Sequence, residues 1–261
     1  MKQSTRILAI IVVLACVPFA CRSALRAGQH APVQSKPRAV QIKSGSETIN
    51  GYLVLPDSPG RHPALIVVHE WWGLNDWVKE QTRKLADAGY VALAVDLYRG
   101  DVATTLEEAH EISRGVPDDR ALRDLEAGFT FLAARPDVDK MKIGTVGWCM
   151  GGGYALELAV NEPKLAACVV NYGAMPTDRG SIARIHAPVL GNFGAEDRGI
   201  SISDVHSFAT AMKSAGKSVD LKVYDGAGHA FANESIKESY RPAAAADAWN
   251  RTLAFLSKTL K

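Results

Sequence analysis

Cysteine is scarce in this sequence, and its spacing excludes two common uses of the residue. The 261 residues include four cysteines, of which only Cys149 and Cys168 lie outside the N-terminal region. Two cysteines in a body of this length do not form a disulfide framework, and no C-x-x-C pair or histidine-rich spacing predicts a metal site. We therefore expect no bound metal, and either a disulfide between Cys149 and Cys168 or an unpaired, reactive thiol.

An excess of charge of one sign is also lacking, since Lys and Arg together number 30 and Asp and Glu number 28. Residues 1–50 contain seven basic residues and one acidic residue, which leaves 23 basic and 27 acidic side chains in residues 51–261. A mildly acidic body argues against a nucleic-acid partner, because binding to phosphates needs clustered Lys and Arg. The motifs G-x-G-x-x-G and G-x-x-x-x-G-K-[ST] are absent, so the sequence predicts no nucleotide cofactor.

Long apolar runs are rare, and the clearest one lies at the N-terminus. Lys2 and Arg6 precede an apolar stretch over residues 7–15, a pattern typical of an export signal. The stretch is shorter than the roughly 20 residues that a comfortable membrane span needs. Cys16 lies where a lipoprotein signal carries its lipidated cysteine, whereas residues 20–24 contain an ordinary cleavage site as the alternative. An uncleaved N-terminal anchor is the third interpretation.

These observations divide the chain into three parts. Residues 1–24 are predicted to be a signal peptide or lipoprotein signal, residues 25–38 a linker, and residues 39–261 one domain. We expect the protein to be exported, and to be periplasmic, lipid-anchored in the bacterial envelope or secreted. We also expect a monomer whose partners are a small molecule and, if Cys16 is lipidated, a membrane.

The body of the chain alternates strands and helices. Apolar runs typical of strands buried on both faces are separated by amphipathic helical patterns. The predicted strands cover residues 40–43, 49–55, 64–68, 91–95, 143–146, 167–170, 189–193 and 219–224. The predicted helices cover residues 76–88, 103–114, 118–134, 150–160, 203–215 and 243–260. This order predicts one α/β domain with a mainly parallel sheet, helices on both faces and an N-terminal antiparallel hairpin.

Residues 147–151 read Gly-Trp-Cys-Met-Gly and lie between a predicted strand and a predicted helix. The pattern G-x-C-x-G is that of a nucleophile elbow with Cys149 as the nucleophile. Glycine on either side removes the Cβ atoms that would clash across such a sharp turn. The turn also places the sulfur at a helix N-terminus, where the helix dipole stabilises a thiolate. The alternative is a small, buried cysteine at a glycine-rich helix start.

A cysteine nucleophile needs a base and an acid that orients the base, and in this fold they follow in the order acid, then histidine. His229 lies in a loop directly after the last predicted strand, where a base that reaches back to the elbow is expected. Asp197 follows a buried strand and precedes His229 by 32 residues. Glu196 is a near competitor for the acid, whereas Asp178 and Asp225 are weaker candidates because neither directly follows that strand.

With these motifs the chain resembles the dienelactone hydrolase family of α/β-hydrolases. Similar stretches occur over most of residues 40–260, and they are HEWWGLN at 69–75, DLYRG at 96–100, the cysteine elbow, GAED at 194–197 and GHAF at 228–231. The resemblance implies an α/β-hydrolase fold. It also implies an esterase or lactonase that acts through a thioester and needs no cofactor.

The resemblance implies further site residues. Glu70 matches a family glutamate that interacts with the resting cysteine, with a simple ion pair to a nearby arginine as its alternative. The backbone N–H groups of Met150 and Trp71 would form the oxyanion hole. Arg99 lies near a family arginine that binds a substrate carboxylate, whereas Asn233 stands where a second such arginine is expected.

Aromatic side chains near these motifs either line the substrate pocket or belong to the core. Trp72 and Phe231 are the candidates for substrate contact. The expected function is that of a carboxylic ester hydrolase that cleaves an ester or lactone with Cys149, His229 and Asp197. Two other classes stay open: an exported, non-catalytic α/β binding protein that retains the elbow, and an exported thiol redox protein that uses both body cysteines.

Overall fold

The computed structural model describes residues 37–261. The export signal predicted for residues 1–24 lies outside the described residues, as does the predicted linker up to residue 36. Within residues 37–261, no helix combines the length and the apolar character needed to cross a membrane.

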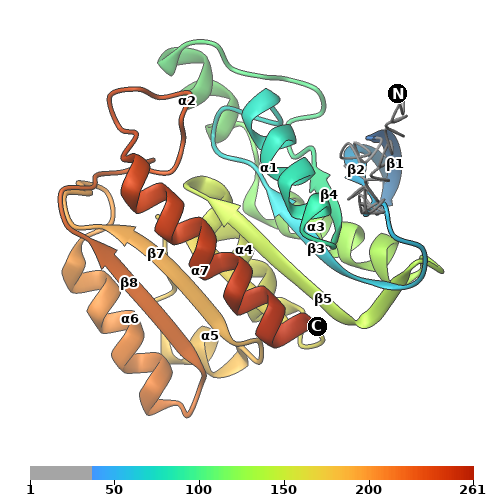
Figure 1. The fold of residues 1–261 in the computed structure, drawn as a ribbon. Coiled ribbons are helices and arrows are strands. Elements are labelled where there is room, and N and C mark those ends of the chain that lie inside the picture. Colours follow the sequence, from blue (N-terminus) through green and yellow to red (C-terminus); the bar gives the residue numbers. More distant parts are fainter. Residues whose placement is uncertain (1–36) are drawn as a thin grey trace, which may run out of the picture. The chain divides into compact units, whose positions relative to one another are not determined.

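An eight-stranded sheet runs through the centre of the described part (Figure 1). Its strands are β1 (Arg38–Ser44), β2 (Glu47–Val54), β3 (His62–Val68), β4 (Val91–Val95), β5 (Val138–Trp148), β6 (Ala167–Asn171), β7 (Val189–Gly194) and β8 (Val219–Tyr224). They lie in the order β1-β2-β4-β3-β5-β6-β7-β8. The β1–β2 and β2–β4 pairs are antiparallel, and the others are parallel. The predicted mainly parallel sheet with an antiparallel hairpin is confirmed.

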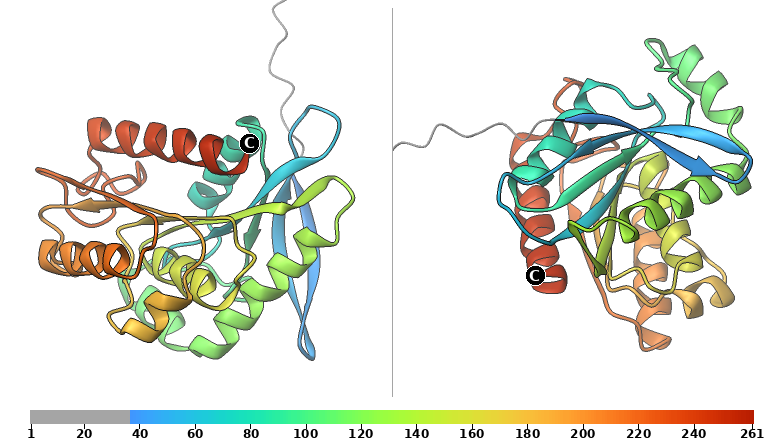
Figure 2. Two further views of the ribbon diagram at one scale, coloured as in Figure 1. Left: turned by 90° about the horizontal axis from the view of Figure 1, so that it is seen from below. Right: turned by 90° about the vertical axis from the view of Figure 1, so that its right-hand side faces the viewer.

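Helices cover both faces of this sheet (Figure 2). They are α1 (Asp76–Asp87), α2 (Leu106–Arg114), α3 (Asp118–Ala133), α4 (Met150–Asn161), α5 (Arg179–Arg184), α6 (Ile202–Ser214) and α7 (Pro242–Leu260). Buried residues of α1 and α7 pack on one face in one hydrophobic cluster, and those of α3, α4, α5 and α6 pack on the other. Because both faces are covered, β4 and β6 are buried along their whole length, as their apolar sequences predict.

Two element boundaries differ from those predicted by three residues or more, and one helix was not predicted. Helix α2 begins at Leu106 rather than at residue 103, because Thr105 and Glu108 form a capping box at its start. Strand β5 begins at Val138, before its apolar stretch, because residues ahead of that stretch also join the sheet, where Val138 pairs with His62 of β3. Helix α5 has six residues and was not predicted, because so short a segment shows no helical periodicity.

Candidate active site

Cys149 alone forms the turn between β5 and α4. Its backbone has φ 55° and ψ −124°, a left-handed conformation that a side chain rarely adopts without support from its surroundings. A Cβ atom on Gly147 would collide with the Gly151 carbonyl oxygen, and one on Gly151 would collide with the Val68 carbonyl oxygen. The glycines of the G-x-C-x-G pattern thus permit a turn that holds the cysteine at the carboxyl edge of the sheet.

His229 lies within hydrogen-bonding distance of both Cys149 and Asp197. His229 Nε2 is 3.0 Å from Cys149 Sγ, and His229 Nδ1 is 2.7 Å from Asp197 Oδ2. The other carboxylate oxygen, Asp197 Oδ1, accepts hydrogen bonds from the backbone N–H groups of Gly199 and Ile200. The carboxylate is therefore fixed on one side by the backbone and orients the imidazole on the other.

The surroundings of His229 and Asp197 shift the pKa values of both side chains. Burial lowers the pKa of His229, but the hydrogen bonds and negative charges of Asp197 and Cys149 outweigh burial and raise it to about 10. Burial raises the pKa of Asp197, but the hydrogen bond and charge of His229 and two backbone N–H groups outweigh that effect and lower it. The protonated form of His229 is thus favoured.

The competing acids lie in other positions. Glu196 lines the same cavity as His229, but it is Asp197 that faces the imidazole. Asp178 accepts a hydrogen bond from the Ser181 backbone N–H and caps α5. Neither side chain orients the base.

Cys168 is buried within β6, where it pairs in register with Thr145 of β5. Burial raises the pKa of its thiol well above the ordinary range, so it remains protonated. Both Cys149 and Cys168 are free thiols in the structure. The disulfide that a thiol redox protein would use is therefore not formed between them. Residues 37–261 also contain no group of three or more His, Cys, Asp or Glu side chains arranged to hold a metal.

The two segments that carry the amides predicted for the oxyanion hole lie next to Cys149. Met150 is the first residue of α4, so its N–H has no acceptor inside the helix. Trp71 follows β3 and lines the cavity next to Cys149. The Tyr98 hydroxyl links the two segments, since it lies 3.1 Å from the Trp71 carbonyl oxygen and 3.3 Å from Met150 Sδ.

Glu70 lies in the same cavity wall but is held by two neutral side chains. Asn233 Nδ2 donates to Glu70 Oε2 at 2.6 Å, and the Tyr172 hydroxyl donates to Oε1 at 3.3 Å. The sulfur of Cys149 is hydrogen-bonded to His229 instead. The predicted contact between Glu70 and the resting thiol is therefore not formed in this structure. The alternative ion pair with an arginine is absent among the described residues as well.

Burial raises the pKa of Glu70 to about 7, against the opposing effects of the Asn233 hydrogen bond, the His229 charge and the Tyr172 hydrogen bond. The folded protein therefore binds the carboxyl proton of Glu70 more tightly than the unfolded chain does. The neutral carboxyl group stabilises the fold fully below the ordinary pKa of 4.5, and this stabilisation is lost as the pH rises through 7. We expect the free energy of unfolding of Glu70→Gln, minus that of the wild type, to grow by about 3 kcal/mol between pH 4.5 and 8. Urea unfolding at several pH values measures this.

Glu196→Gln is the matched control, because this exposed carboxylate lines the same cavity. Its stability should follow the wild-type pH dependence. A Glu70→Gln curve parallel to that of the wild type would mean that Glu70 ionises as an ordinary carboxylate in the folded protein.

A cavity of about 570 Å³ opens onto Cys149 and His229. Its apolar surface comes in part from Trp71 and Trp72, whose rings meet edge to face at 5.2 Å. Trp72 therefore lies where substrate contact was predicted. Phe231 does not, since it is fully buried between the rings of Tyr172 and Tyr224. The prediction for Phe231 is corrected: its bulk supports the core beneath the site.

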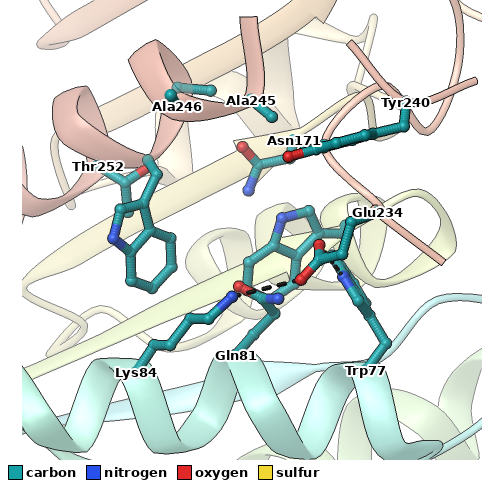
Figure 3. Close-up of a pocket in the computed structure, with 13 residues that line it drawn as sticks. Trp77, Gln81, Lys84, Asn171, Glu234, Tyr240, Ala245, Ala246 and Thr252 are labelled. Atoms are coloured by element: carbon teal, nitrogen blue, oxygen red, sulfur yellow. Dashed lines mark hydrogen bonds and ion pairs between the residues drawn. The ribbon is translucent and has the colours of Figure 1, made fainter. Parts of the chain in front are cut away.

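A second cavity, of about 310 Å³, lies between α1 and α7 (Figure 3). We call it the rear cavity. Its lining is Trp77, Gln81, Lys84, Trp148, Asn171, Ala232, Glu234, Tyr240, Ala245, Ala246, Ala248, Trp249 and Thr252. The segment from Ala232 to Arg241 contributes residues to both cavities, and none of the lining residues is shared.

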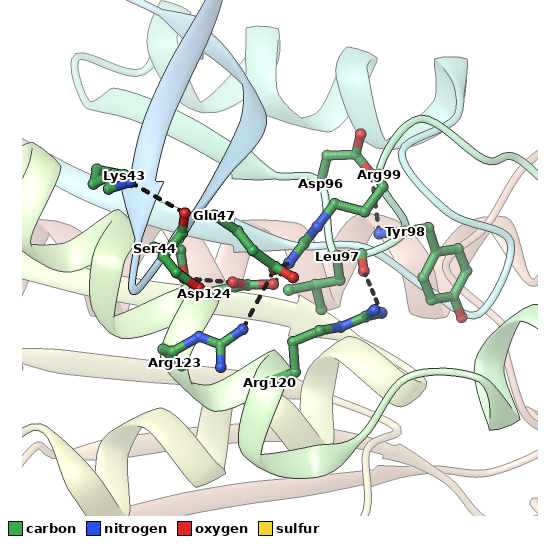
Figure 4. A network of polar contacts seen from close by, with 11 residues as sticks. Lys43, Ser44, Glu47, Asp96, Leu97, Tyr98, Arg99, Arg120, Arg123 and Asp124 are labelled. Atoms are coloured by element: carbon green, nitrogen blue, oxygen red, sulfur yellow. Dashed lines mark hydrogen bonds and ion pairs between the residues drawn. The ribbon is translucent and has the colours of Figure 1, made fainter.

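Arg99 does not reach the cavity at Cys149. Its guanidinium is 2.7 Å from Asp124 Oδ2 and 2.7 Å from Glu47 Oε2, in a network that joins α3 to the β1–β2 hairpin (Figure 4). Asp124 is fully buried, and Ser44 Oγ donates to its other oxygen at 2.5 Å. The predicted substrate-binding role of Arg99 is therefore corrected, because its guanidinium is neutralised by ion pairs with two carboxylates.

Arg99→Ala should lower the free energy of unfolding by about 3 kcal/mol, since it leaves the buried Asp124 carboxylate without a counter-charge. The KM for an anionic ester should stay unchanged. Arg114→Ala, at an exposed position at the end of α2, is the control for loss of one positive charge. Denaturant unfolding and steady-state kinetics check both values. A selective rise in KM with unchanged stability would restore the substrate-binding role.

The fold and the elbow place the chain among known proteins. The family model of the dienelactone hydrolase family matches residues 49–260. The chain belongs to the dienelactone hydrolase family. Similar family proteins include one from Methylorubrum extorquens provisionally named a carboxymethylenebutenolidase, 34% identical over 81% of this chain and 77% of that protein. Another, from Bradyrhizobium sp, is provisionally named a 2-oxo-3-(5-oxofuran-2-ylidene)propanoate lactonase and is 36% identical over 83% of this chain and 92% of that protein.

Solved structures support the same α/β-hydrolase fold. The crystal structure of a protein from Klebsiella pneumoniae, provisionally described as a dienelactone hydrolase, superposes with a TM-score of 0.79. It is 28% identical and covers 85% of this chain and 98% of its own. A dienelactone hydrolase-like promiscuous phosphotriesterase from metagenomic libraries superposes with a TM-score of 0.81 at 25% identity, over 87% of this chain and 100% of its own.

Three residues of the site were not assigned these roles from the sequence. Asn233 was noted only for its place four residues after His229, yet its amide holds Glu70. Tyr172 and Tyr98 each follow a buried strand, and their hydroxyls reach Glu70 and the Trp71 carbonyl oxygen. Their positions at strand ends were a usable signal, but which group each side chain contacts depends on the packing between segments.

Proposed function

We propose that this member of the family hydrolyses a carboxylic ester or lactone through a thioester on Cys149. The observation that carries the proposal is the chain of contacts from Cys149 through His229 to Asp197 beside a cavity of about 570 Å³. The lactonase names given to similar family proteins point to the same bond type.

In the first half of the reaction, Cys149 Sγ attacks the carbonyl carbon while His229 holds the thiol proton. The developing oxyanion lies between the backbone N–H groups of Met150 and Trp71. The protonated His229, oriented by Asp197, then gives its proton to the leaving alkoxide oxygen. The products are the alcohol and a thioester on Cys149.

In the second half, a water molecule takes the place of the alcohol and loses a proton to His229. The resulting hydroxide attacks the thioester carbon, and the same two amides hold the oxyanion. Collapse of this intermediate releases the acid and returns the proton to the thiolate. Every proton moved in this scheme passes through His229 Nε2, the atom that faces the sulfur.

The lining of the cavity favours a substrate with an apolar or aromatic group beside the ester bond. Trp71, Trp72 and Ile236 present apolar surface. The guanidinium of Arg241 also lines the cavity, but it donates to the backbone carbonyl oxygens of Gly226, Glu238 and Tyr240. The Nη2 group of Arg241 has no such acceptor among the described residues, and the exposed Arg198 lines the same cavity, so both can contact an acidic group of the substrate.

The test is a panel of phenyl esters and lactones, such as phenyl acetate and dihydrocoumarin, with acid-quenched samples analysed by mass spectrometry. Hydrolysis that iodoacetamide abolishes, together with an acyl mass on the peptide that contains Cys149, supports the proposal. A protein whose Cys149 is alkylated but which hydrolyses none of the panel is a non-catalytic binding protein.

We further propose that the chain is exported, because Lys2, Arg6 and the apolar residues 7–15 have the order of an export signal. The mature protein should then lack residues 1–15, with lipid on Cys16, or residues 1–24. The intact mass of the protein purified from its native cell envelope distinguishes these forms. A full-length cytoplasmic protein would rule out export.

A further inference from the structure

The rear cavity has aromatic walls. Trp77 of α1, Trp148 at the end of β5 and Trp249 of α7 line it, together with Tyr240. The rings of Trp77 and Trp148 meet edge to face at 5.4 Å. Indole surfaces around a concave space are suited to a flat ligand, because planar rings bury a large area at a small entropy cost.

Two buried polar side chains face this space from opposite helices. Gln81 of α1 is 5% exposed and Thr252 of α7 is 2% exposed, and both line the cavity. In Figure 3 they enter it from below and from above. No hydrogen bond joins either side chain to another residue between 37 and 261. Their polar atoms are open to the water of the cavity, since the buried polar atoms without a partner in residues 37–261 belong to Tyr90, Arg120 and Arg123, and they are therefore available to a polar ligand.

The charged groups of the rear cavity already neutralise one another. Glu234 accepts a hydrogen bond from Trp77 Nε1 at 2.6 Å and forms an ion pair with Lys84 at 3.4 Å. The Asn171 amide donates to the Gly147 carbonyl oxygen and is also occupied. With no unpaired charge left in the lining, the cavity favours a neutral ligand over an ion.

We propose that the rear cavity is a binding site for a small, neutral, planar molecule with an amide-like edge. The edge pairs with the Gln81 carboxamide, and a second polar atom of the ligand reaches the Thr252 hydroxyl. An apolar protein cavity of about 150 Å³ holds a benzene molecule. The volume of about 310 Å³ therefore accommodates two fused rings.

Isothermal titration calorimetry with quinoline-3-carboxamide tests the site directly. This probe has two fused rings, an amide edge and a ring nitrogen, and it is neither an ester nor a lactone, so binding is measured independently of hydrolysis. We expect one molecule per chain with a Kd below about 1 mM. The control ligand 3-methylquinoline keeps the rings and the ring nitrogen but loses the amide, and it should bind about tenfold more weakly.

Variants locate the bound probe. Gln81→Leu keeps a good helix former of similar size and should weaken the carboxamide about tenfold while leaving 3-methylquinoline unchanged. Ala245→Trp fills the cavity and should abolish binding of both ligands. The matched control is Ala243→Trp, an exposed position on the same helix outside the lining, which should bind as the wild type does.

Alkylation of Cys149 separates the rear cavity from the cavity at the elbow. Saturating probe should leave the rate of alkylation by iodoacetamide unchanged, and the alkylated protein should still bind. The proposal is overturned if the wild type shows no binding up to about 5 mM probe. It is equally overturned if Gln81→Leu and Ala245→Trp bind normally while alkylation of Cys149 prevents binding, which would place the probe in the catalytic cavity.

Discussion

Cys149→Ala is expected to reduce kcat for ester hydrolysis by about 10⁴- to 10⁶-fold. The alanine removes the only side chain of the elbow that can form the thioester, and water then has to attack the ester without covalent catalysis. The cavity, the two oxyanion amides and His229 stay in place, so the residual rate reports what binding and polarisation achieve alone. Initial rates on the ester panel, with active sites counted by thiol titration of the wild type, measure the effect.

Cys168→Ala is the matched control, because it removes the other thiol of the domain from a position fully buried in β6. Its kcat should match that of the wild type, while the free energy of unfolding falls by about 1 kcal/mol through the lost packing. Iodoacetamide should inactivate the wild type and Cys168→Ala alike. Full activity in Cys149→Ala, or inactivation that tracks labelling of Cys168, would refute the assignment of the nucleophile.

Asp197→Asn should reduce kcat by about 10⁴-fold, the second largest effect expected. The amide can donate to His229 Nδ1, which places the imidazole proton on Nε2 and directs it at the sulfur, so that His229 can no longer accept the thiol proton. The substitution also removes one of the two charges that raise the pKa of His229. The pKa of His229 should therefore fall, and the limb of the pH profile that reports this imidazole should move to lower pH than in the wild type.

The pH profile of kcat/KM and the rate of Cys149 alkylation against pH measure these effects. Glu196→Gln is the control for loss of a carboxylate from the adjacent position, and it should retain the wild-type rate. The double variant with Cys149→Ala should be no slower than Cys149→Ala alone, since the acid acts only through His229 and the sulfur. Equal losses in Asp197→Asn and Glu196→Gln would mean that the cavity responds to its net charge and not to the orientation of the base.

The parts of the site that could be predicted are those that local backbone rules impose. A nucleophile on a strand-to-helix turn requires small residues on both sides, and this requirement is visible as the glycines around Cys149. Asp197 and His229 could be found because the carboxyl ends of parallel strands meet at one edge of the sheet. The same rules predicted the sheet itself, since β4 and β6 are continuous apolar runs.

The parts that could not be predicted depend on contacts between distant segments. Arg99 follows β4 at a position suited to the cavity, but it forms an ion pair with the buried Asp124 carboxylate on α3 instead. Phe231 is two residues from His229, yet its ring enters the core between two tyrosines. The partner of Glu70 is a carboxamide 163 residues away in sequence. No local pattern encodes such pairings, because they are decided by how the loops pack against one another.

The left-handed conformation of Cys149 has counterparts along the same edge of the sheet. The described non-glycine residues with positive φ are Arg99, Cys149, Tyr172 and Ala230, and they follow β4, β5, β6 and β8 respectively. Among the described residues, positive φ at a non-glycine position is thus confined to the rim that carries Cys149 and His229. Stability and reactivity are consequently divided between the two ends of the strands. An engineer who seeks a more heat-resistant enzyme can substitute at the amino-terminal rim and leave the reactive rim untouched.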